Sequence, residues 1–446
     1  MTKAGGVGDA PSLNPSEIER VLGEHGAKVI ELISYKAQKK NLALYVAGGF
    51  VRDLLLRRQT LDLDFVLEGD AIEFARSLAK SFGGNVLVHK EFGTAKWCLD
   101  EGVTHSLTLV RDALPDSIDF VTARSESYTH PTALPVVSPA DIESDLLRRD
   151  FSINALAIQL SPRARYGRLV DVCNGVKDLE QRLIRALHDH SFVDDPTRIL
   201  RALRYALRLD FQLDLNTAEW MKTALPYLGR ITGQRLRNEI DLILNEPRAS
   251  DIMLQLQDLD ALVNIHPAFR VSPRLPELIA RVCKTGPPWS TVAVDGRTLL
   301  WIALMSGIGS LEVKDLCERL ALTNKLTQAI TASARLSEQI HLLEDPDIRP
   351  SQVAQVLDEY LDVALQSVWL LSLEKLAARE IIAAYASYWR DRRPTISGHD
   401  LKAMGVAPGP RYSQILDQLR FAWIDGDVRS VEDETALLQK LVENDD

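Results

Sequence analysis

The chain has 446 residues, a length typical of about three domains. Hydrophobic residues make up 46% of it and charged residues 26%, which excludes disorder of the whole chain. The formal net charge of −10 excludes unspecific binding to nucleic acids or membranes, so any contact with RNA requires a local basic patch.

Signals for a membrane or for secretion are missing from the sequence. The longest apolar run, Leu299 to Met305, is far shorter than the ~18 residues that a membrane span needs. Residues 1–14 lack an apolar core, so we expect a flexible tail there rather than a signal peptide. The four cysteines include no CxxC pair and are too few for a disulfide framework. We therefore expect a cytoplasmic protein that does not bind membranes.

The first 160 residues alternate between helical and strand patterns. Helices are predicted where apolar residues recur at helical spacing, and strands where short apolar or alternating runs occur. The predicted helices span 15–39, 51–57 and 70–81, and the predicted strands span 42–47, 61–67, 85–89, 96–99, 106–110 and 117–123. The pattern predicts a mixed α/β head whose strands are mostly antiparallel.

After Arg182 the chain has almost no strand pattern and many amphipathic helical stretches. The predicted helices span 197–209, 217–228, 234–244, 297–305, 313–320, 325–343, 352–361, 363–385 and 411–425. Proline and glycine residues near 247, 273–288 and 394–398 are typical of joints between subdomains. The predicted fold class is therefore α+β, with a small head that contains a mixed or antiparallel sheet and an all-helical remainder.

Paired aspartates are the first candidate functional residues. Asp62 and Asp64 alternate on a predicted strand, so both side chains point to the same face. Two adjacent carboxylates repel each other unless a cation neutralises them, and oxygen-only ligands suit Mg²⁺. A later strand offers a third carboxylate, Asp119. Three such groups on neighbouring strands can hold two metal ions for an in-line phosphoryl transfer.

A glycine turn precedes these carboxylates. Gly48 and Gly49 leave room for backbone N–H groups to approach a triphosphate, because they lack Cβ atoms. Arg52, one turn into the next helix, adds a forked cation for phosphate oxygens, and Asp53 completes the motif. An Asp-x-Asp pair alone is more often a solvated strand segment, but this motif upstream favours a nucleotide site. The sequence lacks the GxGxxG pattern of a dinucleotide fold.

Two arginine-rich segments follow, Arg148 to Leu156 and Asp194 to Arg208. On a helical wheel, one face of the second segment carries Arg198, Arg201, Arg204 and Arg208, and the opposite face is apolar. Such helices are usually solvated, but solvated faces mix Glu with Lys, whereas this face is nearly all Arg. Residues 148–208 hold 12 Lys and Arg against 7 Asp and Glu, the local patch that RNA binding requires.

Five motifs in series resemble the class II tRNA nucleotidyltransferases (CCA-adding enzymes), which belong to the DNA polymerase β-like nucleotidyltransferase superfamily. The motifs are Gly48-Gly49-x-Val-Arg-Asp53, Asp62-x-Asp64, Arg148-Arg149-Asp150-x-x-x-Asn154-Ala155-Leu156, Asp171-x-x-x-Gly175-x-x-Asp178-Leu179 and Asp194-Asp195-x-x-Arg198. They lie within residues 42–245, and a weaker match to the end of the family covers Ile396 to Pro410.

The resemblance implies a polymerase-β-like head, then a neck, a body and a tail that are all helical. We expect a flexible N-terminal tail over 1–14 and the nucleotidyltransferase head, or palm, over 15–160. A nucleotide-reading neck over 161–247, a helical body over 248–393 and a helical tail over 394–446 would follow.

The resemblance also implies roles for individual residues. Asp62 and Asp64 would bind Mg²⁺, and Asp119 matches the third catalytic acid. The expected nucleotide-binding residues fall into three sets: Gly48, Gly49, Arg52 and Asp53 at the triphosphate; Arg149, Asp150 and Asn154 at the ribose and phosphates; and Asp195 and Arg198 at the base edge of CTP or ATP, with Arg201 reaching the phosphates. The implied RNA partner is the acceptor arm of tRNA.

The implied function is template-independent addition of CCA, from CTP and ATP, to the 3′ end of tRNA with release of pyrophosphate. Residues 125–139 match the family's flexible loop, which enzymes that add only CC typically lack. An enzyme that adds only the terminal A, beside a separate CC-adding enzyme, stays open as an alternative. A poly(A) polymerase, whose GRRFxLxHV-like stretch is missing from the sequence, and a non-catalytic RNA-binding protein are less favoured. The patterns do not indicate an oligomeric state.

Overall fold

The structure is a computed structural model that describes residues 15–60, 63–107, 115–127, 130, 132, 135–284, 286–289 and 294–443. The chain divides into two compact units, Met1–Ile231 and Thr232–Asp446, which are described separately below. The tail predicted over 1–14 lies outside the described residues.

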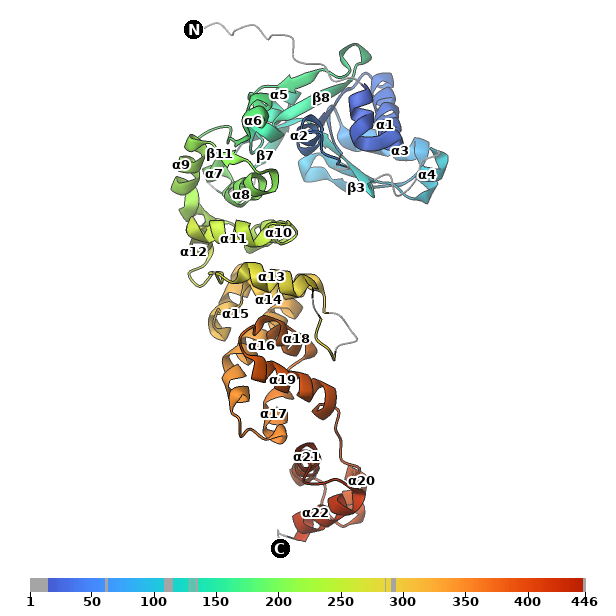
Figure 1. The fold of residues 1–446 in the computed structure, drawn as a ribbon. Helices are drawn as coiled ribbons and strands as arrows, with labels where there is room; N and C mark the ends of the chain where they lie inside the picture. The colour runs from blue at the N-terminus through green and yellow to red at the C-terminus, as the bar shows by residue number, and fades with distance from the viewer. Residues whose placement is uncertain are drawn as a thin grey trace. The chain divides into compact units, whose positions relative to one another are not determined.

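Unit 1 is built around a seven-stranded sheet with the order β3-β4-β5-β2-β1-β8-β9 (Figure 1). Its strands are β1 Ala43–Ala47, β2 Asp64–Glu68, β3 Asn85–His89, β4 Thr94–Cys98, β5 Ser117–Thr122, β8 Leu156–Ser161 and β9 Leu169–Asp171. All neighbouring strands pair antiparallel except β2 and β5, which run parallel. The prediction of a mostly antiparallel sheet is confirmed, and the one parallel pair carries the aspartates discussed below.

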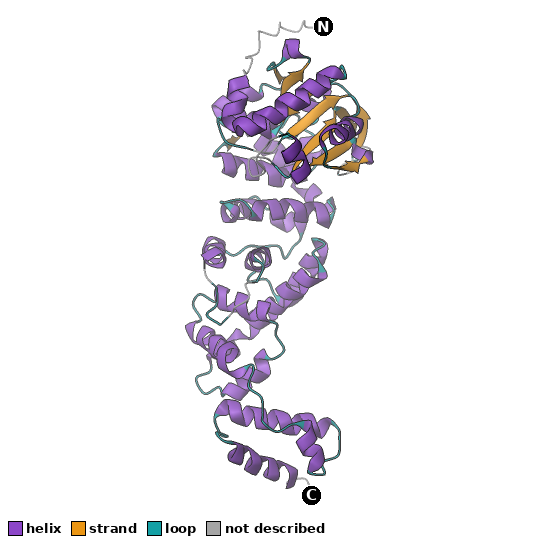
Figure 2. Cartoon of the chain, turned by 90° about the vertical axis from the view of Figure 1, so that its right-hand side faces the viewer, coloured by secondary structure: helices purple, strands orange, loops and turns teal. Residues whose placement is uncertain are grey.

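Helices pack on both faces of this sheet (Figure 2). The helices of unit 1 are α1 Pro15–Lys39, α2 Gly49–Leu55, α3 Ala71–Phe82, α4 Glu101–Ser106, α5 Ile142–Leu147, α6 Gly175–Gln181, α7 Ser191–Asp194, α8 Thr197–Leu209 and α9 Leu215–Ala224, with short 3₁₀ turns at Lys90–Phe92, Ser152–Asn154, Arg163–Arg165 and Leu225–Arg230. Phe74 of α3 meets Phe120 of β5 edge to face at 5.6 Å, and Phe120 stacks on Phe65 of β2 at 5.3 Å. On the other face, buried Ile142 and Leu146 of α5 pack in one apolar cluster with strand residues of β1, β2 and β8.

The predicted strand over 106–110 is wrong at its first residue. Ser106 ends the helix α4, and residues 108–110 lie outside the described part of the chain. Asp100 explains the helix, because its Oδ1 accepts a hydrogen bond of 3.0 Å from the backbone N–H of Val103. Such a cap satisfies an amide that the first helical turn leaves without a partner.

Two short sheets were not predicted. Strands β10 Leu183–Ile184 and β11 Gln212–Leu213 pair parallel on either side of α7 and α8 in the sequence. Strands β6 Arg124–Ser127 and β7 Val136–Pro139 pair antiparallel as the two arms of a hairpin. Apart from Arg124, the hairpin arms lie within the predicted flexible loop over 125–139, so the two ends of that loop are regular strands.

Unit 2 consists of helices joined by loops, with no strand among its described residues. Its helices are α10 Gly233–Leu244, α11 Ala249–Asp258, α12 Ala261–Ile265, α13 Leu275–Lys284, α14 Gly296–Leu304, α15 Ser310–Arg319, α16 Asn324–Gln339, α17 Pro350–Leu357, α18 Asp362–Leu371, α19 Leu376–Ala384, α20 Gly398–Ala403, α21 Pro410–Asp425 and α22 Val431–Glu443, with a 3₁₀ helix at Ile340–Glu344 and a π-helix at Tyr385–Trp389. The single helix predicted over 363–385 is therefore two helices, α18 and α19.

The apolar core of unit 2 joins helices that are far apart in sequence. Leu336 of α16, Leu357 of α17, Leu365 of α18 and Ile382 of α19 are each fully buried in one cluster, which also includes Ile424 of α21. No helix in the described part of the chain is long and apolar enough to cross a membrane.

Candidate active site

The two parallel strands of the seven-stranded sheet, β2 and β5, bring two carboxylates together. Asp64 opens β2, Asp119 lies in the middle of β5, and the two residues are direct partners in the register. Side chains alternate along a strand, so direct partners share a face, which here is the face opposite Phe65 and Phe120. Asp62, the other predicted metal ligand, lies outside the described residues.

Lys96 is a member of this site that the sequence analysis missed. It lies on β4 directly opposite Asp119, and its Nζ donates a hydrogen bond of 2.9 Å to Asp119 Oδ2. The hydrogen bond to Asp119 and the negative charges of Asp119 and Asp64 raise the pKa of Lys96. Lys96 is the one charged residue of β4 and belongs to no motif. Its role could be recognised only from the pairing register of β4 with β5.

The glycine turn lies at the same end of the sheet as Asp64, because β1 runs antiparallel to β2 and ends at Ala47. Gly48 has a φ of 78°, a left-handed conformation that favours glycine. A Cβ atom on Gly48 would lie 2.6 Å from Nη1 of Arg149 and would displace that guanidinium group. The turn thus brings two predicted nucleotide-binding positions into direct contact.

A continuous chain of hydrogen bonds joins five of the predicted nucleotide-binding residues. Arg52 is bidentate to Asp53, with Nε–Oδ1 of 2.9 Å and Nη2–Oδ2 of 2.8 Å, and its Nη1 donates to Asn154 Oδ1 at 2.7 Å. Asn154 Nδ2 donates to Asp150 Oδ1 at 3.1 Å. Arg201 Nε and Nη2 donate to Asp150 Oδ2 at 2.9 and 2.6 Å. The chain runs from α2 in the head to α8.

The charges in this chain stabilise one another. Burial alone would lower the pKa of Arg52, which is 3% exposed, but the hydrogen bonds and charge of Asp53 raise it above its ordinary value. Burial alone would raise the pKa of Asp150, but the charge of Arg201 and hydrogen bonds from Asn154 and Arg201 lower it. Both groups are therefore charged at neutral pH.

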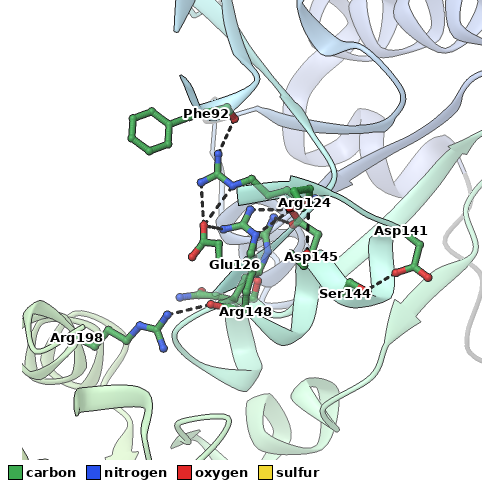
Figure 3. A network of polar contacts seen from close by, with 12 residues as sticks. Phe92, Arg124, Glu126, Asp141, Ser144, Asp145, Arg148 and Arg198 are labelled. Atoms are coloured by element: carbon green, nitrogen blue, oxygen red, sulfur yellow. Dashed lines mark hydrogen bonds and ion pairs between the residues drawn. The ribbon is translucent and has the colours of Figure 1, made fainter. Parts of the chain in front are cut away.

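A second network links the hairpin to the arginine pair, as Figure 3 shows. Glu126 Oε1 of β6 accepts hydrogen bonds from Arg148 Nη1 at 2.9 Å and from Arg124 Nη2 at 3.0 Å. Asp145 of α5 binds both members of the pair, with 2.7 Å to Arg148 Nη2 and 3.1 Å to Arg149 Nη2. Arg124, Glu126 and Asp145 belong to none of the five sequence motifs and were not predicted. The one hint in the sequence is that these charged residues lie shortly before the motif that starts at Arg148.

The predicted base-reading residues lie at the N-terminal end of α8, with Asp195 just before the helix and Arg198 in its first turn. Arg198 is 6% exposed, and its guanidinium donates to Ser191 Oγ at 2.7 Å and to the carbonyl oxygen of Arg148 at 2.9 Å (Figure 3). Asp195 Oδ1 accepts hydrogen bonds from the backbone N–H and the hydroxyl of Thr197, at 3.1 and 2.6 Å. Arg204 is also 6% exposed. The arginine face of α8 is therefore a largely buried polar surface and not a solvated one.

The sequence matches known families over most of this unit and beyond it. Residues 44–185 match the family described as the Poly A polymerase head domain. Residues 210–271 match the family described as the probable RNA and SrmB-binding site of polymerase A. An A-adding tRNA nucleotidyltransferase of Halalkalibacterium halodurans is 30% identical over 406 residues, which cover 87% of this chain and 86% of that protein.

The chain belongs to the tRNA nucleotidyltransferase family. A second relative, an A-adding tRNA nucleotidyltransferase of Geobacter sulfurreducens, is 31% identical over 90% of this chain, which spans only 46% of that protein's length. Among solved tRNA nucleotidyltransferases, the Thermotoga maritima CCA-adding enzyme complexed with tRNA-CCA matches with a TM-score of 0.70 and 28% identity. That match covers 98% of this chain and 100% of the Thermotoga chain.

These comparisons confirm the expected family and the expected fold class, a polymerase-β-like mixed-sheet head followed by a helical remainder. They also confirm the prediction of a nucleotidyltransferase enzyme. tRNA nucleotidyltransferases generally depend on a divalent metal ion. The roles predicted for single residues and the predicted domain boundaries at 160, 247 and 393 remain predictions.

Proposed function

We propose that this chain adds nucleotides to the 3′ end of tRNA without a nucleic-acid template, building CCA from CTP and ATP and releasing pyrophosphate. The observation that carries the proposal is the direct pairing of Asp64 with Asp119 beside the Gly48–Arg52 turn. In this reaction the 3′-hydroxyl of tRNA attacks the α-phosphorus of the nucleotide. The bond from that phosphorus to the bridging oxygen of the β-phosphate breaks.

The carboxylates fit a magnesium ion, the cofactor that we propose. Asp64 and Asp119 provide only oxygen donors, which Mg²⁺ prefers, and they share one face of the sheet. The ammonium group of Lys96, bound to Asp119 at 2.9 Å, shows that this position favours a positive charge. When bound, the metal would supply charge neutralisation and activation of the attacking oxygen. We propose that Asp64, Asp119 and Asp62 hold it.

The surrounding residues would bind and orient the nucleotide. Gly48 and Gly49 allow the backbone to approach the triphosphate, and Arg52 offers a guanidinium that Asp53 holds in place. We propose that Arg149, Asp150 and Asn154 contact the ribose and phosphates. Asp195 and Arg198 would read the base edge, and Arg201 would reach the phosphates. Because Arg201 and Arg198 are hydrogen-bonded within the protein in this structure, binding would exchange some of these bonds for ligand contacts.

Addition of the terminal A alone is the second candidate function. The Halalkalibacterium and Geobacter relatives described above are both named A-adding enzymes, whereas the Thermotoga structure is of a CCA-adding enzyme. The motifs of the active site do not separate the two activities. In either case we expect the acceptor arm of tRNA as the RNA partner and the cytoplasm as the location.

The direct test is extension of three tRNA transcripts that end before CCA, after C and after CC. Each is incubated with purified protein, Mg²⁺ and CTP or ATP, alone and together, and the products are resolved at single-nucleotide resolution. Complete CCA on the shortest transcript would establish the first candidate. Addition of A only to the transcript ending in CC would establish the second. Failure of folded protein to extend any transcript would contradict both.

A further inference from the structure

Tyr205 of α8 contacts both Arg52 and Arg201, which lie at opposite ends of the hydrogen-bond chain described above, and none of the sequence motifs includes it. Three guanidinium groups contact its ring, with 5.4 Å from Arg52 Cζ, 5.5 Å from Arg201 Cζ and 5.2 Å from Arg204 Cζ to the ring centroid. Arg52 comes from α2, whereas the other two arginines come from α8 itself. The ring therefore connects the predicted triphosphate turn to the helix whose first turn contains Arg198.

The remaining contacts of Tyr205 fix the ring itself. Its Oη accepts a hydrogen bond of 3.2 Å from Arg201 Nη2. Phe151 meets the ring edge to face, with centroids 5.8 Å apart and an interplanar angle of 82°. Phe151 is fully buried, so this packing gives the tyrosine a fixed orientation.

The ring has a physical reason to lie among these arginines. Three guanidiniums this close to one another repel, and Arg52 and Arg201 each form a bidentate pair with a carboxylate, that of Asp53 and that of Asp150 respectively. The negative face of an aromatic ring attracts a guanidinium, and it does so without forming the strong, directional pair that a third carboxylate would make. The ring face therefore offsets part of the repulsion among the three guanidiniums.

We propose that Tyr205 is a positioning residue for nucleotide binding, whose ring holds Arg52, Arg201 and Arg204 in the arrangement that receives the nucleoside triphosphate. Because these groups already contact the ring, Tyr205 acts through the arginines and not by stacking on the base. This inference rests on the proposed nucleotidyl transfer, and it concerns the aromatic ring more than the hydroxyl group.

The test compares Tyr205→Leu, which removes the ring, with Tyr205→Phe, which keeps it. Tyr227→Leu is the matched control, because Arg230 Cζ lies 5.0 Å from the Tyr227 ring elsewhere in the same unit. For each variant and the wild type we would measure the dissociation constant of ATP with Mg²⁺ by equilibrium dialysis. We would also measure the kcat and the KM for ATP in tRNA extension and the midpoint temperature of thermal unfolding of each protein.

Tyr205→Leu should raise the dissociation constant and the KM for ATP by about tenfold. Its kcat should change by less than about threefold, as expected when binding is weakened equally in the ground and transition states. Tyr205→Phe should restore the affinity to near the wild-type value, and Tyr227→Leu should leave it unchanged.

Two results would overturn the inference in distinguishable ways. If the wild type binds ATP and extends tRNA but Tyr205→Leu keeps the wild-type ATP affinity, with or without a lower unfolding midpoint, Tyr205 is only structural. If the folded wild type neither binds ATP nor extends tRNA, the proposed function fails and this inference fails with it.

Discussion

The ammonium group of Lys96 neutralises part of the charge that Asp64 and Asp119 bring to one face of the sheet. Lys96 and Asp119 have 41% and 38% of their side chains exposed, so the pair contributes little stability, on the order of 0–1 kcal/mol. We expect the ammonium group of Lys96 and a metal ion to compete for Asp119, because a metal ion bound to this carboxylate would displace the ammonium group. Lysine and metal would neutralise the same carboxylate in turn.

Lys96→Ala should therefore unfold at a lower temperature than the wild type in the absence of metal, because the two carboxylates are left to repel each other. Saturating Mg²⁺ should raise the unfolding midpoint of Lys96→Ala more than that of the wild type. Lys80→Ala is the control, since Lys80 is exposed on α3. Equal Mg²⁺-induced shifts in all three proteins would contradict the competition between lysine and metal.

At the scale of residues, the sequence motifs identified several residues that contact one another in the structure, either within one motif or between two motifs. Arg52 with Asp53 and Arg149 beside Gly48 are two such contacts, although the motifs named only the residues and not the contacts between them. Lys96 could not be predicted, because its place beside Asp119 depends on the pairing of β4 with β5. Tyr205 was missed since an aromatic residue in an arginine-rich helix is indistinguishable from a core residue by pattern alone.

At the scale of elements, one buried glutamate connects α22 to the segment that precedes α20. Glu434 is fully buried, and its carboxylate accepts hydrogen bonds from the backbone N–H of Thr395 at 2.9 Å and of Ile396 at 3.3 Å, and from the hydroxyl of Thr395. Removing the carboxylate would abolish these hydrogen bonds to a charged acceptor, each of which contributes more to stability than a neutral hydrogen bond. The connection lies entirely within unit 2.

Glu434→Ala should lower the free energy of unfolding by about 2–3 kcal/mol, measured by denaturant titration of the full chain. Hydrogen exchange at the amides of Thr395 and Ile396 should become faster in this variant. Gln439→Ala, a change at an exposed position of the same helix, should leave both properties unchanged. Unaltered exchange at the two amides in Glu434→Ala would show that the carboxylate does not hold this segment.

The elements themselves were predictable where their pattern is long or strictly alternating. The strand over 85–89 has the predicted bounds, and the helix predicted over 70–81 is displaced by one residue at each end. The failures have local causes: the Asp100 cap begins a helix before Ser106, and two-residue strands such as β10 and β11 are too short to show a period. A regular apolar pattern likewise did not reveal the break between α18 and α19.

At the scale of the whole molecule, charge is distributed unevenly along the chain. The net charge is −10, yet residues 148–208 have five more basic than acidic residues. Specific RNA contact through a basic segment of an acidic protein should depend strongly on salt, because bound phosphates release counterions. The sequence alone predicts this property, since it requires no knowledge of how segments pair.

The logarithm of the tRNA association constant should therefore fall linearly with the logarithm of salt concentration. The slope should be about −0.7 to −0.9 for each phosphate contacted. The slope can be measured by fluorescence anisotropy with labelled tRNA at about 50 to 200 mM salt. Over this range the association constant should change by about tenfold or more. Arg208→Ala removes a cation from the exposed end of the arginine face and should make the slope less steep. An affinity independent of salt would contradict a phosphate-dominated interface.

The topology of the sheet, that is, which strands pair and in which direction, cannot be predicted from local sequence patterns. Strands β2 and β5 pair in parallel although more than fifty residues separate Asp64 from Asp119 in the chain. The sequence suggested that the acidic strands are neighbours in a mostly antiparallel sheet, but it did not reveal that these two strands run parallel or that Asp64 and Asp119 are direct partners. Their pairing is what turns separate acidic residues into one candidate metal site.

Under the proposed function, nucleotide transfer to tRNA requires the paired carboxylates of Asp64 and Asp119. The most direct measurement is the rate of extension of a tRNA transcript ending in CC by Asp64→Asn and Asp119→Asn, with ATP and Mg²⁺. Glu91→Gln, a change at an exposed position of the head, is the control. Both aspartate variants should remain folded and lose activity by at least about 10²-fold, whereas the control retains it. Folded variants that extend tRNA at the wild-type rate would contradict the account.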